Sequence, residues 1–342
     1  MRGRCGKPGA FAVLFLLLFL PTLSHAGLES DWVLTNESNH IKTYQRIYPG
    51  SKLLQFKAIC VIDARAENFG QVLRDLDAMP LWMDMCEKAT LISEIDENNR
   101  TLHILLDLPV VNDRDLVVKT DTVYDLERAR GVVDLSLVQN SGVPVPDGVV
   151  RLAAFSGSYV FEYITREKTG LIYTYYSDPG GLLPAFLVNF VGKHMLYNTF
   201  EKLGRMVQSD NYVQAARKSK DRKLFESILS DPERVKAITK NRLMEYCRNE
   251  AMIDRAVNDP NIIDLMVNGD GKMMEQVFLS WGSRDMLIKA LQTVLRVHAR
   301  QYTMDEKVIE KIAGNRKLID AIIDGDKPGQ PTAAEMLQSL LE

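Results

Sequence analysis

The side chains that could carry chemistry in this chain are the Arg114-Asp115 pair, five histidines and four cysteines. A nucleophile or general base needs an orienting partner, and no Gly-x-Ser-x-Gly, phosphate-loop or His-Glu-x-x-His motif supplies one. Only His194, in a helical apolar stretch, is placed to enter an interior cavity. A lone histidine is more typical of a structural hydrogen bond than of catalysis. The sequence therefore predicts no catalytic residue.

The cysteines also fail to form a recognisable site. Cys60, Cys86 and Cys247 show no Cys-x-x-Cys spacing and no histidine ligand pattern beside them. They are better interpreted as small buried apolar side chains. We therefore predict no metal and no cofactor.

The first 26 residues are typical of a secretory signal peptide. Arg2, Arg4 and Lys7 form a basic start, and residues 10–20 form an apolar run that is short for a membrane span. We expect cleavage after Ala26 and a periplasmic or secreted protein; an uncleaved N-terminal membrane anchor is the alternative. Without the three basic residues the chain has 39 basic and 45 acidic residues, a net charge of −6. This balance excludes a general nucleic-acid binder.

A turn and a helix between residues 178 and 207 suggest a cover over an apolar cavity. Asp178-Pro179-Gly180-Gly181 is a turn sequence, and Pro184 suits the first turn of a helix. The residues after Pro184 are apolar on nearly all sides. Such a helix must be buried, cover a cavity or touch a membrane. We interpret it as a lid over a pocket for lipid.

The elements that would position this lid are mostly strands. Apolar residues alternate in several runs between residues 41 and 177, and short turns separate the runs, which predicts an antiparallel sheet. One long helix then follows, so the fold class is α+β. After Ser209 the alternation ends and short helical runs begin. We predict a signal peptide over 1–26, a lipid-binding domain over 27–209 and an all-α domain over 210–342.

Several landmarks between residues 31 and 207 occur in the order found in a known family. The landmarks are Trp32, Ile41-x-x-Tyr44-x-Arg46, Asp75, Trp82, Pro109, Arg114-Asp115, Pro144, Val150-Arg151 and Asp178-Pro179-Gly180-Gly181-x-x-Pro184-x-x-Leu187-Val188-Asn189. In their order the chain resembles the START (StAR-related lipid-transfer) domain, as a bacterial exported member with an additional helical region.

The resemblance implies a helix-grip fold, in which a curved antiparallel sheet wraps a C-terminal helix around a tunnel for one lipid. It implies a gate between the loop before Arg114 and that helix, and a structural role for Arg114 and Asp115 at the base of the loop. The expected lipid-binding residues are Ile104, Leu106, Leu116, Val118, Thr120, Leu135, Leu137, Phe190 and His194. The expected gate residues are Val110, Val111, Phe186, Val191 and Met195.

The function implied is non-catalytic binding of one lipid, with transfer or sensing and transient membrane contact. The lipid can be a phospholipid, a fatty acid or a sterol or hopanoid-like molecule. Sterol-binding relatives carry a buried charged pair where this chain aligns Ile104 and Thr120. Two alternatives stay open: an enzyme of the cyclase or hydrolase type, and a lipid-gated scaffold whose helical tail binds a protein partner or self-associates.

Overall fold

A computed structural model of the chain describes residues 32–38, 41–109, 111–246, 302–324 and 329–341, together with single residues between 254 and 300. The chain divides into two compact units, one over Asp31–Ser227 and another that includes Ile228–Glu342. The predicted signal peptide over 1–26, the gate residue Val110 and Cys247 lie outside the described residues.

Ten strands of the first unit form one sheet. Its path runs β1-β2-β3-β10-β9-β7-β6-β5-β4, and β8 pairs with β6 off this path. All pairs along the path are antiparallel, whereas the short β8 pairs with β6 in parallel. The strands are β1 Val33–Ser38, β2 Ile41–Ile47, β3 Leu54–Ile62, β4 Cys86–Asp96, β5 Asn99–Leu106, β6 Arg114–Asp125, β7 Arg130–Leu137, β8 Val150–Arg151, β9 Ala154–Thr165 and β10 Lys168–Asp178.

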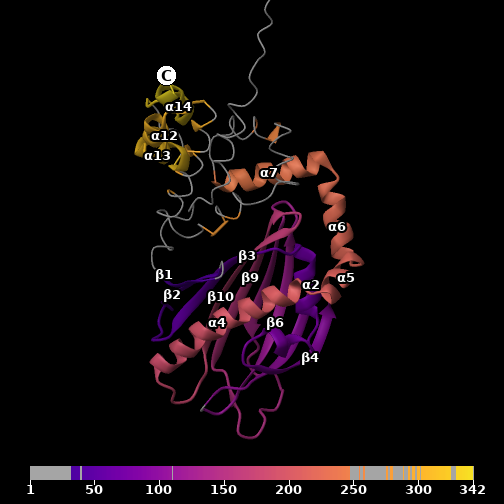
Figure 1. The fold of residues 1–342 in the computed structure, drawn as a ribbon. Helices are drawn as coiled ribbons and strands as arrows, with labels where there is room; N and C mark the ends of the chain where they lie inside the picture. The colour runs from indigo at the N-terminus through magenta and orange to yellow at the C-terminus, as the bar shows by residue number, and fades with distance from the viewer. Residues whose placement is uncertain are drawn as a thin grey trace, which may run out of the picture. The chain divides into compact units, whose positions relative to one another are not determined.

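Three helices cover one face of this sheet: α2 Ala66–Arg74, α3 Met79–Trp82 and α4 Ala185–Val207. The long α4 runs across the sheet (Figure 1). In its C-terminal half every third or fourth residue is buried, because the apolar spacing follows the helical period. These residues, each at most 1% exposed, are Leu196, Phe200, Leu203 and Val207. The predicted α+β helix-grip fold is confirmed.

Two further helices continue the same unit: α5 Asp210–Arg217 and α6 Lys220–Leu229, which belongs to it as far as Ser227. Tyr212 on α5 donates a hydrogen bond to Asp75 beside α2, with 2.8 Å between the oxygen atoms. The unit therefore ends at Ser227, later than the boundary at residue 209 that the change in composition predicts. The physical reason is that α5 and α6 bury side chains and charges against α2, which composition does not reveal.

The described part of the second unit is helical. Its helices are α7 Pro232–Tyr246, α12 Glu306–Ala313, α13 Arg316–Asp324 and α14 Ala333–Leu341. Asp305 and Asn315 cap α12 and α13 by accepting hydrogen bonds from backbone N–H groups at 2.8 and 3.0 Å. Among the residues that the structure describes, no helix combines the length and apolar character needed to cross a membrane.

Candidate functional site

Two cavities among the described residues of the first unit concern the predicted site, and the larger of these two lies between the sheet and helices α2 and α3. Its volume is about 140 Å³, and strands β5, β6, β7, β9 and β10 supply most of its wall. Five predicted lipid-binding residues line it: Ile104, Leu116, Val118, Thr120 and Leu135.

The register of β5 and β6 orders this wall from polar to apolar. Across the two strands Arg100 pairs with Thr120, Leu102 with Val118 and Ile104 with Leu116. These residues alternate along their strands, so their side chains share the inner face. The cavity is consequently polar at the Arg100 end and apolar toward Ile104. Thr122 and Tyr124, farther along β6, line the polar end.

The smaller cavity, of about 90 Å³, lies under the N-terminal half of α4. The loop before β6 contributes Val111, and α4 contributes Val191 and Met195. Three predicted gate residues therefore meet around one space. Leu106, predicted to bind lipid, lines this second cavity and not the first. Leu137 lines neither of the two cavities; it is half-buried against the core.

A row of aromatic rings stands where the two cavities adjoin. Tyr173 lines the larger cavity, whereas Tyr175 and Phe56 line the smaller one. The ring centroids of Tyr173 and Tyr175 are 5.4 Å apart, and those of Tyr175 and Phe56 are 5.5 Å apart. Burial holds the pKa of Tyr175 well above its ordinary value, so the hydroxyl stays a neutral donor.

Helix α4 touches this row at Gly192. The Tyr175 hydroxyl donates a hydrogen bond of 2.9 Å to the Gly192 carbonyl. A Cβ at this position would lie 2.8 Å from Phe56 Cε2, closer than van der Waals contact allows. Glycine is therefore required for the helix to approach the sheet this closely. The contact fixes the middle of α4 and leaves its first two turns as the cover of the smaller cavity.

Three predicted residues on α4 point away from both cavities. Phe186 and Phe190 are 76% and 61% exposed. His194 is also exposed, and its Nδ1 lies 2.9 Å from the Phe190 carbonyl oxygen. Phe190 and His194, predicted to bind lipid, therefore line neither cavity, and Phe186, predicted as a gate residue, does not line the smaller cavity with Val111, Val191 and Met195. These three residues recur every four positions on one stripe, which is turned away from the stripe that carries Gly192.

Arg114 and Asp115 make two separate networks. Arg114 is 3% exposed and donates to backbone carbonyls: Nε reaches Pro179 O at 2.8 Å, and Nη1 reaches Asn112 O. These bonds tie the loop before β6 to the turn before α4. Arg114 therefore holds together the two segments that bound the smaller cavity.

Asp115 faces the opposite side of β6, because neighbouring strand residues alternate. Its Oδ2 lies 2.8 Å from His103 Nε2 and 2.5 Å from Arg151 Nη2. Burial raises the pKa of Asp115, but the hydrogen bonds from Arg151 and His103 outweigh it, and the pKa lies below its ordinary value. An ionised carboxylate shared between two strands is a structural clamp. Among the described residues no group of acidic, histidine and cysteine side chains could hold a metal ion.

The family model of the START domain matches residues 24–211, more than half of the chain. The chain belongs to the START domain family. Phosphatidylcholine transfer protein of Mus musculus is 26% identical over 185 residues, which cover 53% of this chain and 85% of that protein. The same-named protein of Homo sapiens is 21% identical over 192 residues, covering 54% and 86%.

Solved structures agree on the fold. The crystal structure of human STARD10 superposes with a TM-score of 0.50 at 17% identity, over 56% of this chain and 79% of that one. At this identity the likeness shows the shared START fold alone.

The match to the START family model ends at residue 211, but residues beyond 211 also line the larger cavity. Asp221 and Phe225, both on α6, line that cavity. Sequence reasoning missed these residues, since the charged α6 sequence is typical of a solvated helix. It also missed α2 and α3 as the opposite wall, where Phe69 and Trp82 are buried beside the cavity.

Proposed function

We propose that the protein binds one lipid in the two cavities and carries it between membranes without chemical change. The observation that carries this proposal is the larger cavity, enclosed between the sheet and α2 and lined mainly by apolar side chains. Lipid transfer by the phosphatidylcholine transfer proteins supports it. The exposed position of His194 leaves the cavity without the histidine that an acid–base mechanism would use.

Neither cavity is large enough for a lipid in this form. Their volumes, about 140 and 90 Å³, fall below the roughly 300–1,000 Å³ typical of ligand pockets. Even together the two cavities fall below this range, so binding requires the aromatic row between them to part and the joined tunnel to widen. The side chains at the junction, Tyr173, Tyr175 and Phe56, are stacked rings that can separate by rotation.

The first turns of α4 are the moving cover, and a membrane is the place where they move. Leu182, Phe186 and Phe190 expose apolar surface next to the smaller cavity. Burial in a bilayer stabilises apolar surface by roughly 25 cal/mol per Å². A transient membrane contact would thus replace the contacts that α4 makes with Val111 and the sheet, and the lipid could pass without meeting water.

The cavity favours a phospholipid or fatty acid over a sterol. Ile104 and Thr120 put no charged pair at the two positions that align with those of the sterol binders. Asp107, just after β5, is exposed, and Lys119 pairs with Asp121 at 2.8 Å. The charged side chains that do line the cavity, among them Arg74, Arg100 and Asp221, lie at its polar end, where a phosphate or carboxylate headgroup would bind.

We further propose that the chain is exported and that residues 1–26 are removed. The basic start, the short apolar run and the small residues before position 27 support this. N-terminal sequencing of the mature protein tests it. A protein retained in the membrane fraction with Met1 intact would contradict it.

Native mass spectrometry of the delipidated full chain tests the proposed function. Phosphatidylcholine, a fatty acid and a sterol are added separately. We expect a one-to-one complex with phosphatidylcholine or the fatty acid, and recovery of the lipid with unchanged mass. If no lipid class forms a complex, the carrier proposal fails. A chemically altered lipid would indicate an enzyme instead.

A further inference from the structure

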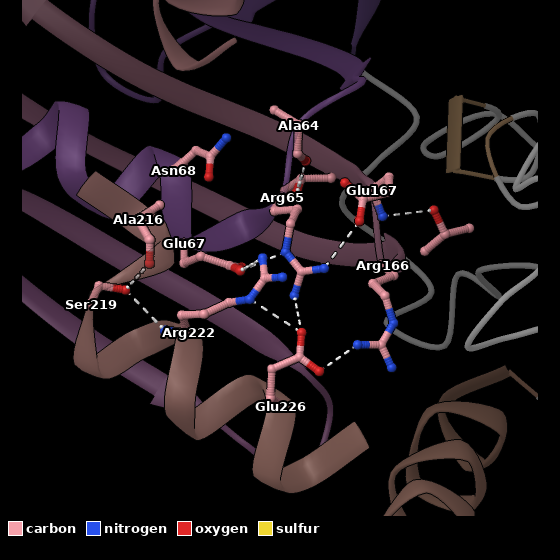
Figure 2. Close-up of polar contacts among 12 residues, drawn as sticks. Ala64, Arg65, Glu67, Asn68, Arg166, Glu167, Ala216, Ser219, Arg222 and Glu226 are labelled. Atoms are coloured by element: carbon pink, nitrogen blue, oxygen red, sulfur yellow. Dashed lines mark hydrogen bonds and ion pairs between the residues drawn. The ribbon is translucent and has the colours of Figure 1, made fainter. Parts of the chain in front are cut away.

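Helix α6 is joined to the sheet and to α2 by a network of ion pairs (Figure 2). Arg222 on α6 donates to Glu67 at 2.9 Å, and Glu226 accepts from Arg65 at 2.8 Å and from Arg166. Arg65 and Glu67 also pair with each other at 2.6 Å. Both are buried, at 7% and 3% exposed. Removing one partner from such a network leaves an uncompensated buried charge, so α6 is firmly held.

At Asp221, the residue before Arg222, α6 also reaches the larger cavity. Asp221 Oδ2 accepts a hydrogen bond of 2.8 Å from Arg74 on α2, and Arg74 Nη2 donates to the Tyr124 hydroxyl at 3.0 Å. A Cβ on Gly70 would lie 3.0 Å from Asp221 Oδ2, so glycine on α2 makes room for this carboxylate. Phe225, one turn farther along α6, lines the cavity beside Asp221.

These contacts lie at the polar end of the cavity. Arg100, paired with Thr120 across β5 and β6, lines the same end, and its guanidinium also donates to the Arg74 carbonyl at 3.2 Å. The side chains of Arg74 and Arg100 are 25% and 13% exposed. Two guanidinium groups and the Tyr124 hydroxyl therefore converge where the wall stops being apolar; each guanidinium also pairs with one carboxylate, Arg74 with Asp221 at 2.8 Å and Arg100 with Glu94 at 3.1 Å. Guanidinium groups bind phosphate through directed, charge-assisted hydrogen bonds.

We infer that α6 completes the lipid-binding site, with the phosphate-bearing headgroup of the lipid under α6 and its acyl chains toward α4. Arg74, Arg100 and Tyr124 bind the headgroup. Asp221 holds Arg74 in place, and Phe225 closes the wall over the glycerol region. This inference rests on the proposed function and adds the direction of the lipid and the role of a helix outside the START match.

Photo-crosslinking on the intact full chain tests the direction of the lipid. One probe is phosphatidylcholine with a diazirine on the headgroup, and the other carries the diazirine at the end of an acyl chain. We expect the headgroup probe to label peptides from α6 and from the 118–125 segment of β6. The acyl probe should label peptides from α4 and the 106–113 loop.

The outcomes separate the two proposals. If the headgroup probe labels α4 or the 106–113 loop and the acyl probe labels α6, the lipid lies the other way and this inference is wrong, while lipid binding stands. If neither probe labels the protein, both proposals fail.

A pair of variants on α6 tests the wall itself. Phe225→Ala should weaken phosphatidylcholine binding at least fivefold, because it opens the cavity to water. Leu224→Ala, a neighbouring residue that lines neither cavity, is the matched control and should change affinity less than twofold.

Asp221→Asn keeps the size of the side chain but loses the ion pair with Arg74, and should lower affinity for phosphatidylcholine more than for a fatty acid. Equal affinities for Phe225→Ala and the wild type, both folded, would overturn the inference.

Discussion

The two helices that cover the cavities are held by different forces. The first turns of α4 are mostly apolar and carry no ion pair among the described contacts; they rest on the sheet through Gly192, the Tyr175 hydroxyl and one neutral hydrogen bond, from Leu54 N–H to Asn189 Oδ1 at 3.1 Å. Helix α6 is held by ion pairs to Arg65, Glu67 and Arg74. A bilayer can replace apolar contacts, but it offers nothing better to a buried guanidinium or carboxylate. We therefore expect the first turns of α4 to move when lipid passes, and α6 to stay in place as a wall of the larger cavity.

The largest expected effect comes from the centre of the α6 network. Glu67→Gln should destabilise the first unit by about 3–5 kcal/mol, since it removes the buried carboxylate between Arg65 and Arg222 and leaves them only the more exposed Glu226 and, for Arg65, Glu167. Urea unfolding measures the loss. Glu201→Gln breaks only an exposed i,i+4 pair with Arg205 and should cost less than about 0.5 kcal/mol. Equal losses in the two variants would show that α6 is not held by these charges.

Two glycines of α4 sharpen the contrast between its middle and its end. Gly192→Ala places a Cβ 2.8 Å from Phe56 and should cost about 1–3 kcal/mol. At Gly204 the nearest atom, Ile62 Cδ1, is 3.7 Å away. Gly204→Ala should therefore be neutral or stabilising by up to about 1 kcal/mol, through helix propensity. Thermal unfolding of both variants decides; a neutral Gly192→Ala would mean that α4 is not seated on the aromatic row.

The exposed stripe of α4 should matter for transfer and not for stability. Phe186→Ser with Phe190→Ser removes apolar surface that lines no cavity, so the fold should change by less than about 0.5 kcal/mol. Lipid transfer between vesicles should fall several-fold, because membrane contact weakens. The control is Ile95→Ser, 84% exposed in β4. A double variant that transfers at the rate of this control would disprove the membrane contact.

A smaller effect is expected from acid. Burial raises the pKa of Glu226, but the hydrogen bond with Arg166 and the charges of Arg166, Arg65 and Arg222 outweigh it, so its pKa lies below its ordinary value. A lowered pKa in the folded state contributes stability above the ordinary carboxylate pKa, and this contribution disappears as pH falls through the folded value.

Hydrogen exchange at pH 7 and at pH 3.5 can follow this loss. Amides of α6 should lose protection at the lower pH before those of the C-terminal half of α4, which buries Leu196, Phe200, Leu203 and Val207 in addition to its polar contacts with Asp84. Simultaneous loss in both helices would remove the distinction between the two covers.

Much of the sheet could be predicted from the sequence, because strand alternation has a strict period of two. Leu116 and Val118 on β6 line the cavity as their alternation indicates. The face of α4 that packs on the sheet was harder to predict, since all residues from 186 to 191 except Asn189 are apolar. The buried positions Leu196 and Phe200 would have settled it: continued backward at helical spacing, they place Gly192 inside and Phe190 outside.

The role of α6 could not be predicted from the sequence. Its charged residues resemble those of any solvated helix, and their partners lie up to 161 positions away, as for Arg65 and Glu226. Arg114 and Asp115 follow directly after the loop at residues 107–113, where the resemblance predicts a structural role for them. Their separate partners, Pro179 O on one face and Arg151 on the other, depend on pairing between distant strands.

Fixing the cover formed by α4 tests the central claim most directly. Val111→Cys and Val191→Cys, which line the same small cavity, are joined by a reducible thiol crosslinker in a chain without Cys5 and Cys247. Cys60 and Cys86 can stay, because burial raises the pKa of both thiols and makes them unreactive. We predict that the crosslinked protein keeps its bound lipid, transfers it between vesicles at least tenfold more slowly, and regains the original rate on reduction. Transfer at an unchanged rate in the fully crosslinked protein would contradict the account of α4 as the moving cover.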